Sequence, residues 1–189
     1  MNKSKLKEIL NTEKELYKKQ VLYSNNIFFA RLKNEAPYRI WKWLRLSRYT
    51  DYYHKQITKT KGLKCFISQI LYIYYIRRKQ KLGERLGLEI GTEHIGKGLI
   101  IYHYNNVING NVVIGENCHI HGTVVIGNKG NGDISCPTIG NNVMIGAGSK
   151  IIGDVFIADN IKIAAGAVVV TSFNEQGITI GGIPAHKLK

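Results

Sequence analysis

The sequence predicts two kinds of structure in one chain: an α-helical region over residues 1–88, and a mainly β domain, a parallel β-helix of six-residue repeats, over residues 89–189. Two observations support this prediction. Aliphatic residues recur at every sixth position in the second half. The net charge of +14 also divides unequally, because residues 1–88 hold 21 Lys and Arg against 6 Asp and Glu, whereas residues 89–189 hold 6 against 7.

The first region has the composition of helices, since Gly and Pro are almost absent from it. Basic residues lie beside Trp and Tyr over residues 39–49 and 65–78. Such a mixture suits the anionic headgroup layer of a membrane, so peripheral membrane contact through residues 39–78 is one interpretation. A second is a helical cap that packs on the β-helix or across an oligomer. Nucleic acid is not expected as a partner, because no recognisable motif supports it.

The repeat is defined by ten aliphatic residues in two runs of six-residue spacing. They are Ile108, Ile114, Ile120 and Ile126, then Ile139, Ile145, Ile151, Ile157, Ile163 and Val169. The residue two positions earlier is usually small or β-branched, which fits a short strand whose alternate side chains point inward. Three such strands close a triangular coil, and stacked coils bury a continuous aliphatic core. An amphipathic helix has a period of about 3.6 residues and not six. A β-sandwich gives no reason for ten aliphatic residues to recur at six-residue spacing.

The register breaks once, between Ile126 and Ile139. The intervening run from Gly127 to Pro137 is rich in Gly and Asn near its start, which indicates a loop that projects from the β-helix. Loops on rigid scaffolds often carry function. We therefore expect this loop to contribute to a site.

Several classes of protein are disfavoured by simple features. The amino terminus is polar and shows no signal peptide, and the apolar stretch from Cys65 to Ile76 is too short to span a bilayer. Three scattered cysteines without a CxxC pair argue against a disulfide framework and a zinc ribbon. We expect a cytoplasmic protein without a metal centre, located at the inner face of the membrane if the basic region binds lipid.

Short motifs in the second half carry a family resemblance. They are Leu86-Gly-Leu-Glu-Ile90, Ile95-Gly-Lys-Gly-Leu99, Tyr102-His-Tyr-Asn-Asn106, Pro137-Thr-Ile-Gly-Asn-Asn-Val-Met-Ile-Gly-Ala-Gly148 and Gly181-Gly-Ile-Pro-Ala185. From about residue 84 onward the chain resembles serine O-acetyltransferases and, more closely, the O-acetyltransferases of bacterial polysaccharide gene clusters. The resemblance implies a left-handed β-helix, a homotrimer and acetyl-CoA as the donor substrate.

The same resemblance implies a catalytic pair, His103 as general base and Glu89 as the carboxylate that orients it. A neutral imidazole suits removal of a hydroxyl proton near neutral pH. Candidate residues for the acceptor site are His121, Asn105, Asn106, Asp133 and Cys136. His119 flanks core Ile120 and is expected at the surface.

The resemblance also places coenzyme A in a groove between neighbouring β-helices of the trimer. By motif match, the residues that would approach it are Gly127, Asn128, Gly146, Ala147 and Ala165, with Lys150 and Lys187 as candidates for its phosphates. A solvated surface charge is the alternative for each lysine.

These features predict an acyltransferase that acetylates a sugar hydroxyl in cell-surface polysaccharide biosynthesis. The projecting loop lacks the Arg-His pair with which serine acetyltransferases typically hold their amino acid, and it reads Asp133-Ile-Ser-Cys136 instead. Two alternatives stay open: a serine O-acetyltransferase of cysteine biosynthesis, and a non-catalytic β-helix that serves as a binding module.

Overall fold

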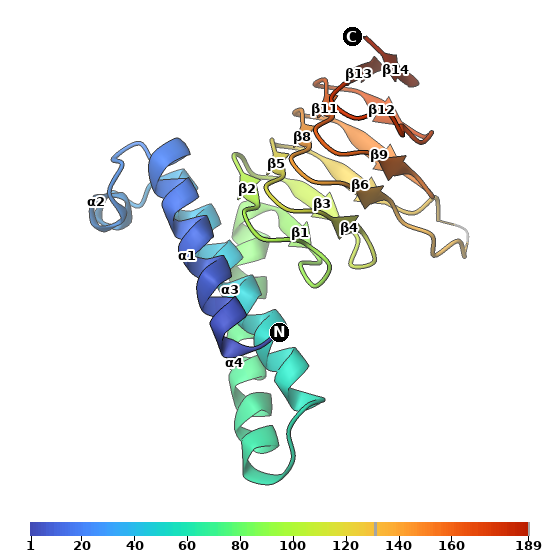
Figure 1. Cartoon of the computed structure of the whole chain (residues 1–189). Helices are drawn as coiled ribbons and strands as arrows, with labels where there is room; N and C mark the ends of the chain where they lie inside the picture. The colour runs from blue at the N-terminus through green and yellow to red at the C-terminus, as the bar shows by residue number, and fades with distance from the viewer. Residues whose placement is uncertain (131, 189) are drawn as a thin grey trace. The chain divides into compact units, whose positions relative to one another are not determined.

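The structure is a computed structural model that describes residues 1–130 and 132–188 (Figure 1). The chain divides into two compact units, Met1–Leu86 and Gly87–Lys189. The first unit contains the helices and the second contains the β-strands. The division between them falls two residues before the one expected from the sequence.

The first unit consists of α1 (Lys3–Gln20), α2 (Ile27–Leu32), α3 (Ala36–Ile57) and α4 (Gly62–Leu86). Polar residues begin two of them: the side chain of Asn2 accepts a hydrogen bond from the backbone N–H of Lys5, and Asn26 does the same for Phe28. In α3 the first turn contains Pro37, whose missing N–H costs nothing there. The expected α-helical amino-terminal region is confirmed, and its last helix ends at Leu86.

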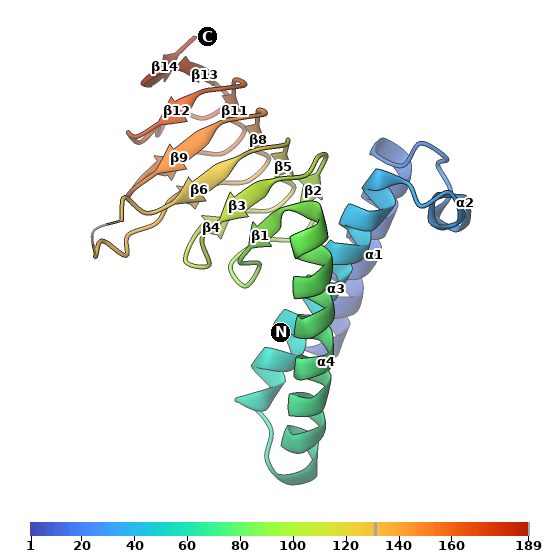
Figure 2. The same cartoon turned by 180° about the vertical axis from the view of Figure 1, so that it is seen from behind.

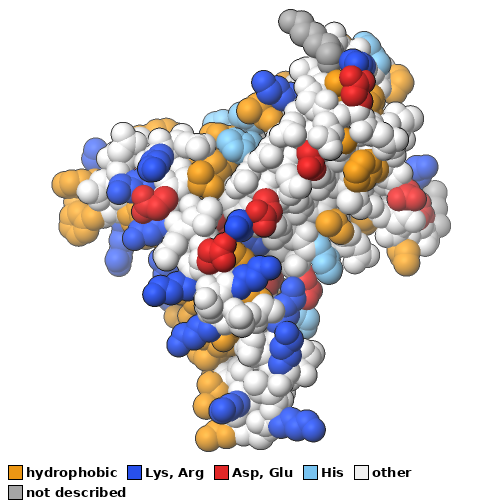
Figure 3. All heavy atoms as spheres, in the orientation of Figure 1, with side chains coloured by type: hydrophobic (Ala, Val, Ile, Leu, Met, Phe, Trp, Pro, Cys, Tyr) orange, Lys and Arg blue, Asp and Glu red, His pale blue; other side chains and the backbone are white. Residues whose placement is uncertain are grey.

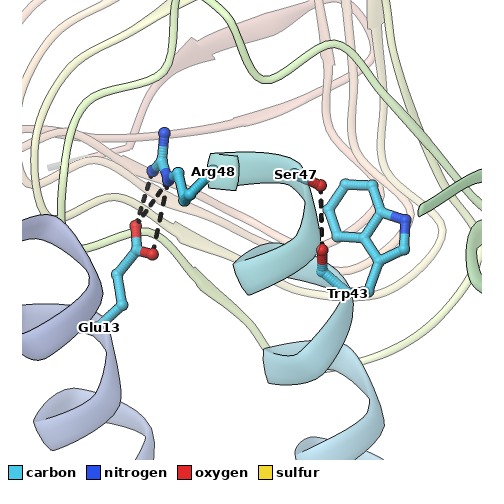
Figure 4. Close-up of polar contacts among 4 residues, drawn as sticks. All are labelled: Glu13, Trp43, Ser47 and Arg48. Atoms are coloured by element: carbon cyan, nitrogen blue, oxygen red, sulfur yellow. Dashed lines mark hydrogen bonds and ion pairs between the residues drawn. The ribbon is translucent and has the colours of Figure 1, made fainter. Parts of the chain in front are cut away.

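The core of the helical unit forms around α3, which packs against α1 and α4. Trp43 and Leu44 are fully buried in it, and Trp41 is nearly so. A buried ion pair links α1 to α3: Arg48 Nη2 lies 2.7 Å from Glu13 Oε1, and Ser47 one residue earlier donates to the carbonyl oxygen of Trp43 (Figure 4). The two tryptophans are therefore core residues, and their expected place in a membrane patch is wrong.

No described helix is long and apolar enough to cross a membrane.

The second unit is a stack of triangular coils (Figure 2). Its strands are β1 (Leu88–Ile90), β2 (Ile100–Ile101), β3 (Asn106–Ile108), β4 (Val113–Ile114), β5 (His119–Ile120), β6 (Val125–Gly127), β7 (Thr138–Ile139), β8 (Met144–Ile145), β9 (Lys150–Ile152), β10 (Phe156–Ile157), β11 (Lys162–Ile163), β12 (Val168–Val169), β13 (Thr179–Gly182) and β14 (Ala185–Lys187). They form sheet A (β1-β3-β6-β9-β12), sheet B (β10-β7-β4) and sheet C (β14-β13-β11-β8-β5-β2).

The aliphatic residues of the repeat stack on one another from coil to coil. Ile108 pairs in register with Ile126 in sheet A, and Ile120 pairs with Ile145 in sheet C. These side chains are buried, whereas the strand residue before each of them is exposed or half-buried. The expected parallel β-helix is confirmed, because inward and outward side chains alternate as the six-residue period requires.

Asparagines turn several corners between sheets B and C. Asn117, Asn142 and Asn160 all have φ near +60°, a conformation that Asn tolerates better than most residues. The side chains of Asn142 and Asn160 also join neighbouring coils by a hydrogen bond of 3.2 Å.

The carboxy-terminal end of the β-helix departs from the parallel pairing of the coils, since β14 turns back and runs antiparallel to β13.

The projecting loop leaves the β-helix between β6 and β7, at the corner from sheet A to sheet B. The side chain of Asn128 donates to the backbone oxygen of Asp133, and Gly130 forms an antiparallel bridge with Asp133. The loop is thus folded on itself at its base, while Asn131 lies outside the described residues.

Candidate active site

His103 lies at a corner where the chain passes from sheet C to sheet A. The corresponding segments of four successive coils form one edge of the β-helix, here called the His103 edge: Tyr102–Asn105, His121–Thr123, Gly146–Gly148 and Ala164–Gly166. Backbone hydrogen bonds hold the segments together: Thr123 N–H donates to Tyr104 O, Gly148 to Gly122 and Gly166 to Ala147. The edge therefore places histidines at one end and small residues along the rest.

Three histidines and a tyrosine gather at the first two coils of this edge. The ring of His121 stacks on Tyr102 with centroids 4.7 Å apart, and it lies 6.4 Å from the ring of His103. The hydroxyl of Tyr102 is hydrogen-bonded to His119 Nδ1 at 3.1 Å. Four titratable rings thus share one surface, with His103 the most exposed of the histidines among them.

The backbone at His103 is held from two sides. The side chain of Asn106 is fully buried, donates to His103 O at 2.9 Å and accepts from Val124 N–H at 3.0 Å. Below the imidazole, Gly122 leaves room for the side chain, since a Cβ built at Gly122 would lie 2.8 Å from His103 Cβ. The hydrogen bonds of Asn106 and the absence of a side chain at Gly122 therefore fix the position of the His103 backbone and Cβ.

The environment keeps two of these imidazoles neutral. Burial lowers the pKa of His121, and the neighbouring His103 lowers it further. Burial likewise lowers the pKa of His119, with a smaller contribution from His121. Burial raises the pKa of Tyr102, so its phenol stays protonated. At neutral pH the cluster therefore offers imidazole nitrogens that can accept a proton.

Glu89, the predicted partner of His103, lies in β1 with its side chain exposed. Its register partner in the next coil is Val107, four residues beyond His103. Across residues 1–130 and 132–188, no hydrogen bond or ion pair joins Glu89 to His103. The pairing stays a prediction.

The remaining acceptor candidates divide between two corners. Asn105 is exposed on the His103 edge with φ of +62°. Asn106 adjoins it and is buried, and both ends of its amide are hydrogen-bonded within the β-helix. Its contact with an acceptor stays a prediction. Asp133 and Cys136 lie on the projecting loop, which the fold does not bring to the His103 edge of the same chain.

The two loop residues also differ in their chemistry. The backbone N–H of Ser135 donates to Asp133 Oδ1 at 2.9 Å, and this bond lowers the pKa of the carboxyl. Burial raises the pKa of the Cys136 thiol. Cys136 is therefore a poor nucleophile at neutral pH, where the thiolate is scarce.

The coenzyme A candidates are also spread over more than one corner. Gly146, Ala147 and Ala165 lie on the His103 edge, whereas Gly127 ends β6 and Asn128 begins the projecting loop. Gly146 has a structural reason to be glycine, since a Cβ there would lie 2.5 Å from the backbone nitrogen of Ala165 in the next coil.

Of the two candidate lysines, Lys150 is exposed on sheet A and Lys187 on β14. The ammonium of Lys187 already contacts both carboxylate oxygens of Glu175, at 2.6 and 2.7 Å. A phosphate at Lys187 would compete with that carboxylate.

Sequence reasoning missed Tyr102, Gly122 and the half-buried position of His119. The signal was present, because Tyr102 and His121 each directly follow a core isoleucine of sheet C. Because Ile101 and Ile120 pair in register, the residues that follow them, Tyr102 and His121, lie one above the other on neighbouring coils.

No described group of three His, Cys, Asp or Glu side chains is arranged to hold a metal ion.

Comparison with known proteins gives relatives for the second unit. No family model matches the chain. An Escherichia coli (strain K12) protein, WcaB, provisionally named a colanic acid biosynthesis acetyltransferase, is 41% identical over 88 residues, which are 46% of this chain and 54% of that protein. A serine acetyltransferase of Staphylococcus epidermidis is 41% identical over 106 residues, 54% of this chain and 49% of that enzyme. The chain spans about half the length of these relatives.

Solved structures extend the likeness to the whole chain. The Neisseria gonorrhoeae serine acetyltransferase CysE in complex with serine superposes with a TM-score of 0.74 at 24% identity, over 99% of this chain and 70% of that one. The soybean serine acetyltransferase apoenzyme gives 0.73 at 24% identity, over 97% and 69%. The chain thus has the fold of the serine acetyltransferases, helices followed by a left-handed β-helix, and it is related in sequence to the hexapeptide-repeat acetyltransferases.

Proposed function

We propose that this protein transfers an acetyl group from acetyl-CoA to a sugar hydroxyl during assembly of a cell-surface polysaccharide. The observation that carries the proposal is the cluster of Tyr102, His103, His119 and His121 at one edge of an acetyltransferase-type β-helix. An imidazole at an exposed corner is a suitable group to remove the proton of an alcohol hydroxyl.

In the proposed reaction the acceptor hydroxyl lies against His103. Its oxygen attacks the thioester carbonyl carbon while His103 takes the hydroxyl proton, so the new C–O bond forms as the proton leaves. Collapse of the tetrahedral intermediate breaks the C–S bond, and the imidazolium returns its proton to the sulfur of coenzyme A. No acyl-enzyme is needed, because the thioester is already activated.

Other groups on the edge have supporting roles in this proposal. Glu89 would face the imidazolium that forms on His103 and favour its charge. His121, whose ring stacks on Tyr102 and lies 6.4 Å from the ring of His103, would line the acceptor site beside His103. Backbone N–H groups at the Gly-rich corner are the candidate donors to the oxyanion, which such groups stabilise strongly where water is excluded.

The charge of the β-helix unit favours a neutral acceptor. Residues 87–189 contain no arginine, so the unit cannot offer the bidentate guanidinium contact that suits an amino acid carboxylate. The described part of the projecting loop instead presents Lys129 and Asp133. A sugar needs no charged contact and fits this surface better than free serine does.

Serine is the second candidate acceptor. The 41% identity to the Staphylococcus epidermidis enzyme favours it. The proposal of a sugar relies on the 41% identity to WcaB and on the missing guanidinium.

The proposed assembly is a homotrimer in the cytoplasm. A trimer would place the loop of one chain, with Asp133 and Cys136, against the His103 edge of its neighbour. It would also let Gly127 and Asn128 of one copy and Gly146, Ala147 and Ala165 of another line one groove for coenzyme A.

The test is thiol release from acetyl-CoA in the presence of L-serine, sugar nucleotides or oligosaccharides. His103→Ala should lower kcat about 10²- to 10⁴-fold, the usual contribution of a general base. His94→Ala is the matched control, because His94 is exposed in the same β-helix outside the His103 edge. Turnover with serine alone would favour the second candidate. Near-normal turnover by His103→Ala would sink the mechanism, and no coenzyme A binding by calorimetry would favour a non-catalytic module.

A further inference from the structure

Helix α4 exposes a continuous apolar face. Leu63, Phe66 and Ile70 are 73%, 58% and 51% exposed. Together with Ile67, Ile73 and Tyr74 they form what we call the α4 stripe. Single exposed apolar residues are ordinary, but a contiguous face of this kind marks a surface that meets something apolar.

The α4 stripe follows one side of the helix, because its members are three or four residues apart. The opposite side packs on α3: the ring of Tyr75 stacks on Tyr49 and Tyr53, with centroids 4.8 and 5.5 Å away. The helix therefore has its tertiary contacts without the stripe, and the stripe is left for another partner.

Positive charge brackets the stripe. Between Asp51 and Glu84 the chain has no acidic residue and eight basic ones: Lys55, Lys59, Lys61, Lys64, Arg77, Arg78, Lys79 and Lys81. Exposed lysines precede the stripe and exposed Arg77, Arg78 and Lys81 follow it. The guanidinium of Arg78 lies over the ring of Tyr74 at 4.9 Å, so the cationic end adjoins the apolar face directly. Figure 3 shows hydrophobic and basic side chains gathered along the lower part of the helical unit.

We propose that the α4 stripe docks on an anionic lipid surface, with α4 lying in the plane of the headgroups. An apolar face flanked by Lys and Arg is what such binding requires: apolar side chains enter the acyl boundary, and cations stay at the phosphates. This inference does not depend on the proposed acetyl transfer. It also narrows the contact expected over residues 39–78 to α4, since Trp41 and Trp43 of α3 are buried.

Charge disfavours a second copy as the occupant. In either a parallel or an antiparallel packing of two α4 stripes, each cationic end would face another cationic end, because both ends are basic. Nucleic acid is disfavoured for a different reason. It would match the cations but leave six apolar side chains against a polar, solvated backbone.

Flotation of the full chain with vesicles tests the proposal. Vesicles of phosphatidylcholine alone are compared with vesicles containing about one third phosphatidylglycerol, at low and high salt. The stripe variant is Phe66→Ser/Ile70→Ser/Ile73→Ser. The control variant is Gln69→Ser/Gln80→Ser, at exposed polar positions of the same helix.

We expect the unaltered chain and the control to float with anionic vesicles only, and less so at high salt. The stripe variant should partition at least about tenfold more weakly, because three apolar side chains no longer leave water. Unchanged far-UV circular dichroism would show that it is folded. The proposal is overturned if the unaltered chain does not float, or if the stripe variant floats equally well. It is also overturned if light scattering shows a smaller oligomer for the stripe variant than for the control, since the stripe would then cover another copy.

Discussion

Substitution of Gly122 by alanine should displace the candidate base, His103, while leaving its imidazole group chemically unchanged. Gly122 is buried beneath His103, and its φ lies outside the positive range, so alanine meets no backbone strain there. Its Cβ would, however, lie 2.8 Å from His103 Cβ and 3.3 Å from Tyr104 O. Ordinary contact begins at 3.4 Å, so the imidazole-bearing residue must move by at least the difference of 0.6 Å.

The size of the effect follows from that displacement. Overpacking of this kind typically costs about 1–3 kcal/mol of stability, which is a fall in Tm of about 2–4 °C per kcal/mol for a chain of this size. Misplacement of a catalytic group by about 1 Å can cost about 10²-fold in rate. We expect Gly122→Ala to lower kcat by roughly 10- to 100-fold.

Thermal denaturation and thiol release measure the two effects separately. Gly110→Ala is the matched control, because Gly110 lies in the same β-helix without positive φ and with no atom within 4 Å of its added Cβ. Stability should also depend on the residue at position 103. His103→Ala keeps the clashing Cβ, whereas His103→Gly removes it, so Gly122→Ala should destabilise the first background and hardly affect the second.

The reasoning fails if Gly122→Ala matches Gly110→Ala in both Tm and kcat. It also fails if Gly122→Ala costs the same stability in the His103→Gly and His103→Ala backgrounds, since the contact with His103 would then not be the cause.

Three further outcomes are expected. Glu13→Gln should destabilise the helical unit by about 3–5 kcal/mol, because it replaces the carboxylate 2.7 Å from the buried Arg48 guanidinium by a neutral amide. Urea denaturation measures this, and a loss below about 1 kcal/mol would contradict it. Because the pKa of His121 is lowered in the folded state, the unfolded chain binds more protons as pH falls below about 6.5, so stability should decline from there downward. His121→Asn should flatten the Tm profile between pH 7.5 and 6, and an unchanged profile would refute the assignment. Cys136→Ser should leave kcat within about twofold, since burial raises the pKa of the Cys136 thiol and keeps it protonated; a loss of activity would instead make the thiol a participant.

The β-helix was predictable because its period is strict. Ile145 and Ile163, for example, are 18 positions apart in the sequence, which is three six-residue repeats, and they pair in register in sheet C. The corner of His103 was less predictable. Ile101 and Ile108 are seven residues apart instead of six, so the chain carries one extra residue there, and the contact between Gly122 and His103 depends on how that residue is accommodated. A motif match identifies His103 as the candidate base, but it does not predict the contacts with Asn106 and Gly122 that position His103.

The helical unit shows the opposite case. Its helices follow from composition, yet the sequence did not reveal which aromatic residues are inside. Trp41 and Trp43 have the same basic neighbours as the exposed residues of α4, but α3 packs against both α1 and α4, and the two tryptophans are buried. The ammonium of Lys79 in α4 lies 5.6 Å from the centre of the Trp43 ring, a contact between residues 36 positions apart that no local pattern contains.

The reversal of β14 also bears on how long such a stack can grow. A pile of parallel coils ends in strands whose backbone groups are free to recruit further strands, and an open end of this kind can seed fibres. In sheet C, β14 takes that place along β13, with Ile180 opposite Lys187. Its direction is wrong for another parallel coil, and its outer residues His186 and Lys187 are polar and exposed. A further coil that continued sheet C in parallel would have to displace this hairpin.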